Sequence, residues 1–129
     1  MRAIDTNVVV RFLTNDDKRQ AAAARVAIAE GDIFIAVTVL LEAEWVLRSA
    51  YGFEPARIAR AFRGLAGLPK IVVEDPAKLA QALNWMGQGM DFADALHLAK
   101  AEGRTAFLSF DRTLAKVAQT SGATPVEEP

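Results

Sequence analysis

Residues 31–52 read GDIFIAVTVLLEAEWVLRSAYG and contain, in order, the two signals that decide the fold class. The short β-branched run Ile33–Val37 follows a Gly-Asp pair and predicts a buried strand. Thr38 then has the character of an N-cap, so we expect a helix from there towards Tyr51, with Gly52 just past its end. A strand followed at once by a helix is the first half of a βαβ unit.

The same alternation of short apolar runs and helical stretches continues on both sides of this segment. Further strands are expected at Arg2–Ile4, Lys70–Val73 and Thr105–Ser109, and an edge strand at Thr124–Val126. Helices are expected over Asp16–Glu30, from Glu54-Pro55 to Gly64–Gly67, from Asp75-Pro76 to about Met86, over Asp91–Glu102 and over Arg112–Thr120, whereas Val8–Leu13 only continues the first apolar run. Four or five strands that alternate with helices predict an α/β protein with a central parallel sheet. In such a sheet the ligand site lies beyond the carboxyl ends of the strands.

Length and composition fit one domain over residues 1–129, with residues 127–129 expected to fray. Hydrophobic residues make up 52% of the chain, and a net charge of -1 gives no global affinity for nucleic acid, so such binding needs a local patch. The absence of cysteine excludes thiolate chemistry, and the single histidine excludes multi-His zinc sites. No secretory signal and no apolar run of membrane-spanning length are evident, which predicts a cytoplasmic protein.

Five acidic residues fall where the predicted strands end and the predicted helices begin. Asp5 follows the first strand directly, and Asp111 follows the fourth with one residue between. Glu42 lies in the first turns of the helix after Val37, and Asp91 and Asp94 share one side of a helix start. In a parallel sheet these carboxylates gather at one edge and raise one another's pKa values, so a cation must offset them. Oxygen ligands without Cys or multiple His favour Mg²⁺ or Mn²⁺.

Each of these acidic residues also has a purely structural explanation. Asp91 can be an N-cap, with Asp94 favoured by the helix dipole. Asp5 and Asp111 can be turn formers. Glu42 can be a plain surface residue, although it lies on the flank of its helix's apolar face.

Other polar and aromatic residues are expected to be structural. Glu44 points away from the apolar face, and an exposed pair with Arg48, four residues later, explains it. His97 lies three residues after Asp94, where a solvent-facing or packed histidine is a better explanation than a catalytic base. Trp45 and Trp85 are expected in the core rather than as base-stacking platforms.

Four blocks of the sequence resemble a known family. They are Ala3–Phe12, with the sequence AIDTNVVVRF; Val39–Leu47, with VLLEAEWVL; Asp91–Ala99, with DFADALHLA; and Phe107–Asp111, with FLSFD. In this order and at these separations they resemble the PIN domain ribonucleases, in particular the VapC-type toxins of bacterial toxin–antitoxin pairs. The resemblance covers nearly the whole chain.

The resemblance implies a fold, a site and partners. The fold is an α/β/α sandwich around a parallel sheet, and the activity is that of an endoribonuclease with an acidic Mg²⁺ or Mn²⁺ site. By position, the metal-binding and catalytic residues are Asp5, Glu42, Asp94 and Asp111, with Asp91 as a less certain fifth. Asn7 and Ser109 match polar positions that orient these carboxylates. A small antitoxin that blocks the active-site cleft and a homodimer are the implied protein partners.

Three functions follow from these residues. The first is a ribonuclease in which a metal-activated water attacks the scissile phosphorus in line. The second is a doubly wound phosphatase with Asp5 as nucleophile, although haloacid-type phosphatases need an Asp where this chain has Asn7. The third is a non-catalytic module that docks a basic partner on its acidic edge. Arg57, Arg60 and Arg63, three residues apart on one helix, are either a phosphate-contacting stripe or a solvated face.

Overall fold

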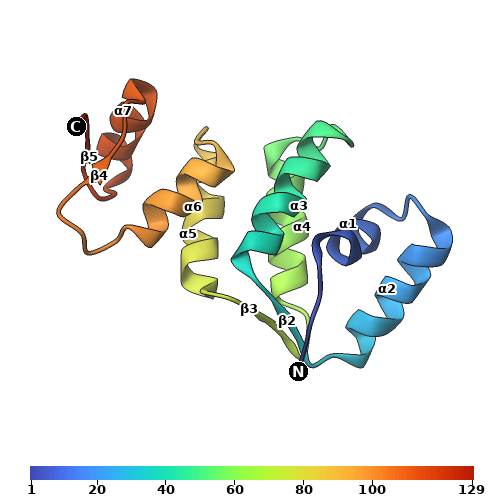
Figure 1. Ribbon diagram of the computed structural model, residues 1–129. Coiled ribbons are helices and arrows are strands. Elements are labelled where there is room, and N and C mark those ends of the chain that lie inside the picture. The colour runs from blue at the N-terminus through green and yellow to red at the C-terminus, as the bar shows by residue number, and fades with distance from the viewer. The chain divides into compact units, whose positions relative to one another are not determined.

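Three parallel strands form the sheet of the first unit of the computed structural model, which describes all residues from Met1 to Pro129. The chain divides into two units, Met1–Pro76 and Ala77–Pro129. The first contains β1 (Arg2–Ala3), α1 (Thr6–Thr14), α2 (Lys18–Glu30), β2 (Ile33–Ile35), α3 (Val37–Ser49), α4 (Pro55–Ala66) and β3 (Ile71–Val73) (Figure 1). The second contains α5 (Pro76–Gly87), α6 (Phe92–Lys100), β4 (Phe107–Leu108), α7 (Arg112–Ser121) and β5 (Val126–Glu127).

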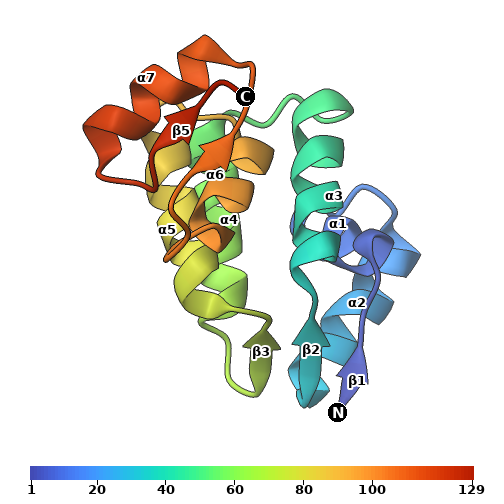
Figure 2. The same cartoon turned by 60° about the vertical axis from the view of Figure 1, so that its left-hand side comes forward.

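The sheet of the first unit has the order β1-β2-β3, with β2 in the centre. Figure 2 shows the three strands side by side and running in the same direction. Arg2 pairs with Ile33, and Ile35 pairs with Val73. Because β2 has a neighbour on each side, its residues Ile33 and Ile35 are fully buried.

Helices α1 to α4 supply the rest of this core. The apolar face of α1 packs against α2 and α3. Alanines at the positions of α2 that face inward let the helices approach closely, while α3 and α4 contribute larger side chains. The fully buried residues of these helices include Val9, Ala21, Leu40, Ala43, Leu47, Ile58 and Phe62.

One helix of this unit was not expected, and one expected helix cap was wrong. The apolar run Val8–Leu13, to which no element was assigned, belongs to the helix α1, which Asp5 caps and which starts at Thr6. Thr38 is not an N-cap, since α3 already begins at Val37 and Ala36 occupies the cap position. The carboxylate of Glu74, just after β3, accepts a hydrogen bond from the Val37 amide at 3.1 Å instead. A contact from a neighbouring strand therefore replaces the local cap.

The second unit has its own small sheet. Strands β4 and β5 are parallel, with Phe107 opposite Val126 and Leu108 opposite Glu127, and they lie beside α7 (Figure 2). The α/β class and the parallel strands are thus confirmed, but the strands form a three-stranded and a two-stranded sheet rather than one sheet of four to five. Glu127 belongs to β5, so the expected frayed tail begins only after it. None of the helices has the length and hydropathy needed to cross a membrane.

Candidate metal centre

Four helices of the protein begin at an aspartate whose carboxylate accepts a hydrogen bond from the backbone. These N-caps are Asp5 on α1, Asp17 on α2, Asp91 on α6 and Asp111 on α7. The cap explanation is therefore confirmed for Asp91, and it replaces the turn explanation for Asp5 and Asp111. An N-cap uses one carboxylate oxygen, so capping leaves a second oxygen with which the same residue can bind a cation. Three of the four caps are candidate site residues.

In the second unit, the charges of Asp91 and Asp111 act on the carboxyl of Asp94. Burial raises the pKa of the Asp94 carboxyl above its ordinary value of 3.8, and the charges of Asp91 and Asp111 raise it further. His97 has the opposite, smaller effect on the same pKa. The Asp94 backbone amide also donates a hydrogen bond to the Asp91 carboxylate at 3.2 Å. The unit thus holds a group of carboxylates in which a nearby positive charge is favoured.

Asp111 is held in place by three hydrogen bonds around the start of α7. Its carboxylate accepts from the Leu114 amide at 3.0 Å, and its own amide donates to the Ser109 hydroxyl at 3.0 Å. Its carbonyl oxygen accepts from the Ala115 amide at 3.1 Å, as the first turn of a helix requires. The Ser109 hydroxyl therefore holds the backbone of Asp111, whereas the resemblance implied that Ser109 orients the carboxylate.

In the first unit, Glu42 lies at the end of α1 that Asp5 caps. The hydroxyl of Thr6, which follows Asp5 and is buried, donates a hydrogen bond to the Glu42 carboxylate. The Asp5 carboxylate accepts from the Val8 amide at 3.2 Å, and both acidic side chains are exposed. Thr6 was not among the residues predicted for the site, although a hydroxyl directly after Asp5 at the start of an apolar run was a usable signal. Asn7 lines a cavity of about 340 Å³ beside α2.

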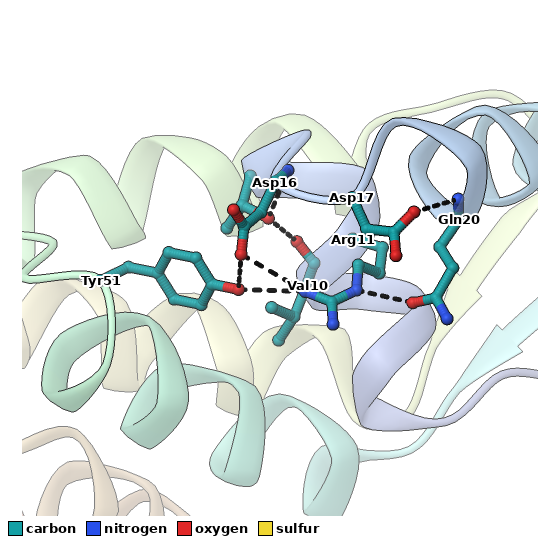
Figure 3. A network of polar contacts seen from close by, with 7 residues as sticks. Val10, Arg11, Asp16, Asp17, Gln20 and Tyr51 are labelled. Atoms are coloured by element: carbon teal, nitrogen blue, oxygen red, sulfur yellow. Dashed lines mark hydrogen bonds and ion pairs between the residues drawn. The ribbon is translucent and has the colours of Figure 1, made fainter.

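A polar network fixes the other end of α1. The Arg11 guanidinium donates to the Gln20 side chain at 2.7 Å and to the Tyr51 hydroxyl at 3.0 Å (Figure 3). The Tyr51 hydroxyl donates to Asp16 at 2.8 Å, and Asp16 also forms an ion pair with Arg11 at 3.7 Å. These contacts tie α1 to the start of α2 and to the end of α3. They fix the axis of the helix that presents Asp5.

The remaining structural expectations had mixed outcomes. Glu44 does pair with Arg48, at 2.9 Å, but the expected exposure was wrong, since Glu44 is only 3% exposed. Trp85 is buried as expected, whereas Trp45 is 59% exposed and does not belong to the core. His97 faces solvent, as one of its two expected settings required.

The three arginines of α4 form an exposed row. Arg57, Arg60 and Arg63 are all exposed, and the Arg57 guanidinium lies 3.7 Å from the centre of the Phe53 ring. This cation–π contact occupies Arg57 with a neighbour of its own unit.

The chemistry of the candidate ligands fits a hard divalent cation. Every candidate ligand is a carboxylate oxygen donor, the type that Mg²⁺ and Mn²⁺ prefer. No three acidic or histidine side chains gather closely enough within either unit to hold an ion by themselves. Magnesium is commonly bound by one or two carboxylates while it keeps several water ligands. Asp94 and one neighbouring carboxylate would therefore be enough protein ligands for a Mg²⁺ ion. The fold is that of an α/β protein, and its second unit contains an acidic group around Asp94.

Comparison with known families adds the identity of the fold. The chain matches the PIN domain family over residues 3–119, a match that spans both units, and it belongs to that family. The PIN domain is an α/β/α fold, so the predicted fold class is confirmed. PIN domains are in general metal-dependent nucleases, and this membership supports a hydrolase that acts on nucleic acid. Neither a curated protein nor a solved structure matches the chain significantly.

Proposed function

We propose that this PIN domain protein is a metal-dependent endoribonuclease and the toxin of a VapBC-type toxin–antitoxin pair. The observation that carries the nuclease proposal is the match to the PIN domain family over residues 3–119. The electrostatics of Asp94 agree with it, because burial and the neighbouring charges of Asp91 and Asp111 raise the pKa of its carboxyl. A carboxylate in this setting binds either a proton or a cation more favourably than an isolated one does. The four sequence blocks that resemble VapC toxins support RNA as the substrate and a role as a toxin.

In this proposal Asp5, Glu42, Asp94 and Asp111 are the metal-binding and catalytic residues. Thr6 orients Glu42 through its hydroxyl, and Ser109 orients Asp111 through its backbone. When bound, Mg²⁺ or Mn²⁺ supplies activation of the attacking water and stabilisation of the negative charge that develops on the phosphodiester. Asp91 holds the start of α6, the helix that presents Asp94, and its charge adds to the attraction for the cation.

The nuclease proposal is tested by cleavage of a mixed cellular RNA preparation with the purified chain. We expect cleavage with Mg²⁺ or Mn²⁺ and none with EDTA. Calcium should bind without supporting cleavage, because it takes more ligands at longer distances and positions the attacking water poorly. Undiminished cleavage in EDTA would contradict the proposal.

Matched Asp→Asn variants separate the loss of charge from the loss of a helix cap. Asparagine is as good an N-cap as aspartate, so Asp5→Asn and Asp111→Asn should keep α1 and α7 intact while they abolish cleavage. Asp17→Asn removes a charge from the cap of α2, which is not a candidate site residue, and should leave cleavage unchanged. An active Asp5→Asn variant would contradict the assignment, and an inactive Asp17→Asn variant would show that the assay reports helix stability.

The toxin role and its partners need separate experiments in cells. Induced expression should arrest growth by cleavage of cytoplasmic RNA, and expression of the Asp5→Asn variant should not. A small antitoxin encoded beside the chain should co-purify with it and suppress cleavage, and light scattering should give the mass of a homodimer for the chain alone. Robust nuclease activity in the tube without growth arrest would contradict the toxin role and leave the nuclease proposal intact.

A further inference from the structure

The longest stretch of the chain without an acidic residue runs from the start of α4 to the end of β3. Residues 55–73 contain three arginines and one lysine and no aspartate or glutamate, although the whole chain has 16 acidic residues and a net charge of -1. The three arginines, Arg57, Arg60 and Arg63, all belong to α4 and are all exposed. This helix therefore carries a local excess of positive charge that the net charge of the chain conceals.

Helix geometry places the three arginines of α4 in one slanting row, which we call the arginine row. Residues three apart on a helix are neighbours, with Cβ atoms roughly 5–6 Å apart. Each step of three residues rises about 4.5 Å and turns back by about 60°, so the row crosses the helix surface at an angle. The core face of α4 is apolar, since Ile58 and Phe62 are buried. The arginine row thus lies on the solvent side of the helix, where its long side chains can spread over several anionic groups at once.

The composition of α4 differs from that of an ordinary solvated helix face. Such faces mix acidic and basic residues, because pairs of opposite charge three or four residues apart stabilise a helix. None of the 12 residues of α4 is acidic, so the helix offers its arginines no such pair. The helix dipole accounts for Arg63 in the last turn, but it disfavours a cation in the first turn, where Arg57 lies. An anion beside Arg57 is favoured both by the guanidinium and by the dipole.

Arg57 is held by a neighbour that leaves its hydrogen-bond donors available. Its guanidinium carbon lies 3.7 Å from the centre of the Phe53 ring, and Phe53 itself is buried. At this distance the guanidinium lies flat on the ring, because an N–H group pointing at the ring would collide with it. The five N–H donors lie in the plane of the guanidinium, so they point away from the contact and can form the fork that binds a phosphate. Because the stacking already orders the side chain, binding costs less conformational entropy.

We propose that the arginine row binds the phosphate backbone of RNA, as a docking surface other than the candidate metal ligands. This inference rests on the proposed ribonuclease function. The candidate carboxylates repel phosphates and the net charge of the chain attracts none, so affinity for RNA needs a local basic surface. Phosphates carry no sequence information, and both single strands and duplexes present them. The arginine row therefore adds affinity that depends on salt but not on sequence or base pairing.

The test measures RNA binding in the Asp94→Asn background, in which the RNA stays intact under the proposed function. The probe is a short, fluorescein-labelled RNA of mixed sequence, single-stranded or annealed to its complement, and fluorescence anisotropy gives its Kd over about 50 to 200 mM KCl. Arg60→Gln should raise Kd roughly fivefold to tenfold near 0.1 M salt, and it should lower the slope of log Kd against log salt by about 0.7 for the single strand and 0.9 for the duplex. Replacing all three arginines by glutamine should lower the slope about three times as much.

The controls separate the arginine row from the charge of the whole chain. Arg19→Gln removes an exposed arginine of α2, a helix that packs against α1, and should change Kd less than about twofold. Arg60→Lys keeps the charge and should keep the salt slope. Thermal melts check that the variants fold, and the single variant Arg60→Gln carries the test if the triple variant does not.

Four outcomes would overturn the inference. They are an unchanged Kd and slope in the folded variants of the row, an equal effect of Arg19→Gln, an effect on the single strand but not on the duplex, and no RNA binding by the Asp94→Asn chain. The first would leave the arginine row to an acidic protein partner, and the third would indicate contacts to bases. Failure of the proposed function would differ from all four, because RNA binding would still depend on the arginine row while the unsubstituted chain never cleaved the RNA.

Discussion

In the unit Met1–Pro76, the candidate carboxylate of Glu42 accepts a hydrogen bond from the buried Thr6 hydroxyl, whereas in the unit Ala77–Pro129 Asp94 has the carboxylates of Asp91 and Asp111 as its electrostatic neighbours. The Thr6 hydroxyl, a neutral donor, gives the Glu42 carboxylate a hydrogen-bond partner without any ion. The second group gains from a proton or a cation, because its neighbours repel the negative form. The comparison shows that the two groups of candidate carboxylates are in different electrostatic settings: Glu42 already has a hydrogen-bond donor, whereas the neighbours of Asp94 favour a positive charge.

The strongest test of this difference between the two units is to remove the charge of Asp94. Asp94→Asn should lower the rate of RNA cleavage by at least about a hundredfold, since loss of a ligand costs no less than loss of the groups that orient ligands. Asp91→Asn keeps the cap of α6 and should cost less. If Asp5 acts on the same ion, the double variant Asp5→Asn/Asp94→Asn should be no slower than the worse single variant, because residues that act as a unit are not additive.

Initial cleavage rates at saturating Mg²⁺ measure this effect, with Asp17→Asn as the control. Additive losses in the double variant would show that Asp5 and Asp94 act independently, and the proposal of one shared ion would then be wrong.

Glu44 is a contrasting case, because its carboxylate already pairs with a cationic side chain of the protein, Arg48. Its side chain is 4% exposed and pairs with Arg48 at 2.9 Å. Arg48→Ala leaves this carboxylate buried without that partner, so we expect the free energy of unfolding to fall by about 2 kcal/mol. Urea denaturation measures it, and Arg48→Lys should recover part of the loss. A loss no larger than that of an exposed pair, below about 0.5 kcal/mol, would show that Glu44 reaches solvent or other donors.

Whether a feature of the fold could be predicted from the sequence depends on whether its signal lies in neighbouring residues or in residues that are distant along the chain. Apolar runs and helix starts are local, so the strands at Ile33 and Ile71 and the alternation with helices were predictable. The cap of α3 was not, because the donor at Val37 finds its acceptor in Glu74, a residue distant in sequence. The pairing of β4 with β5 is equally non-local, and periodicity does not specify a partner strand.

The candidate site shows the same division. The acidic residues could be found from their positions at strand ends, but their double role as helix caps depends on hydrogen bonds that spacing alone leaves open. Helical spacing placed Glu44 on the outer face, and packing buried it, since the sequence does not show which neighbours cover a helix. Trp45 is the converse case, a large apolar residue that no neighbouring element covers.

The orientation of Glu42 can be sharpened with a smaller change. Thr6→Val keeps the shape of the buried side chain and removes the hydroxyl that donates to Glu42. We expect cleavage to slow roughly tenfold, the lower end of the cost of losing a group that orients a ligand. Thr6→Ser keeps the hydroxyl and should restore most of the rate. Equal losses in both variants would attribute the effect to packing of α1, and an unchanged rate in Thr6→Val would show that cleavage does not depend on the hydrogen bond from Thr6 to Glu42.

The smallest expected effect concerns the stability of the metal-free protein as pH changes. The pKa of Asp94 in the folded protein lies above its ordinary value of 3.8, so the folded state binds this proton more tightly than the unfolded chain does. The group therefore favours folding fully below pH 3.8, and this contribution is lost as pH rises through the raised pKa. Asp94→Asn lacks the titration but also gives up a favourable charge in the first turn of α6.

Thermal melts in EDTA, from acid to neutral pH, compare the two chains. The Tm of Asp94→Asn relative to the unsubstituted protein should rise with pH, because only the unsubstituted protein accumulates charge repulsion with Asp91 and Asp111. Addition of Mg²⁺ at neutral pH should then raise the Tm of the unsubstituted protein more, since an ion that binds only the folded state stabilises it. A Tm difference that falls with rising pH would mean that the helix dipole outweighs the repulsion around Asp94. The carboxylates around Asp94 would then not favour a cation, and the second unit would not differ from the first in this respect.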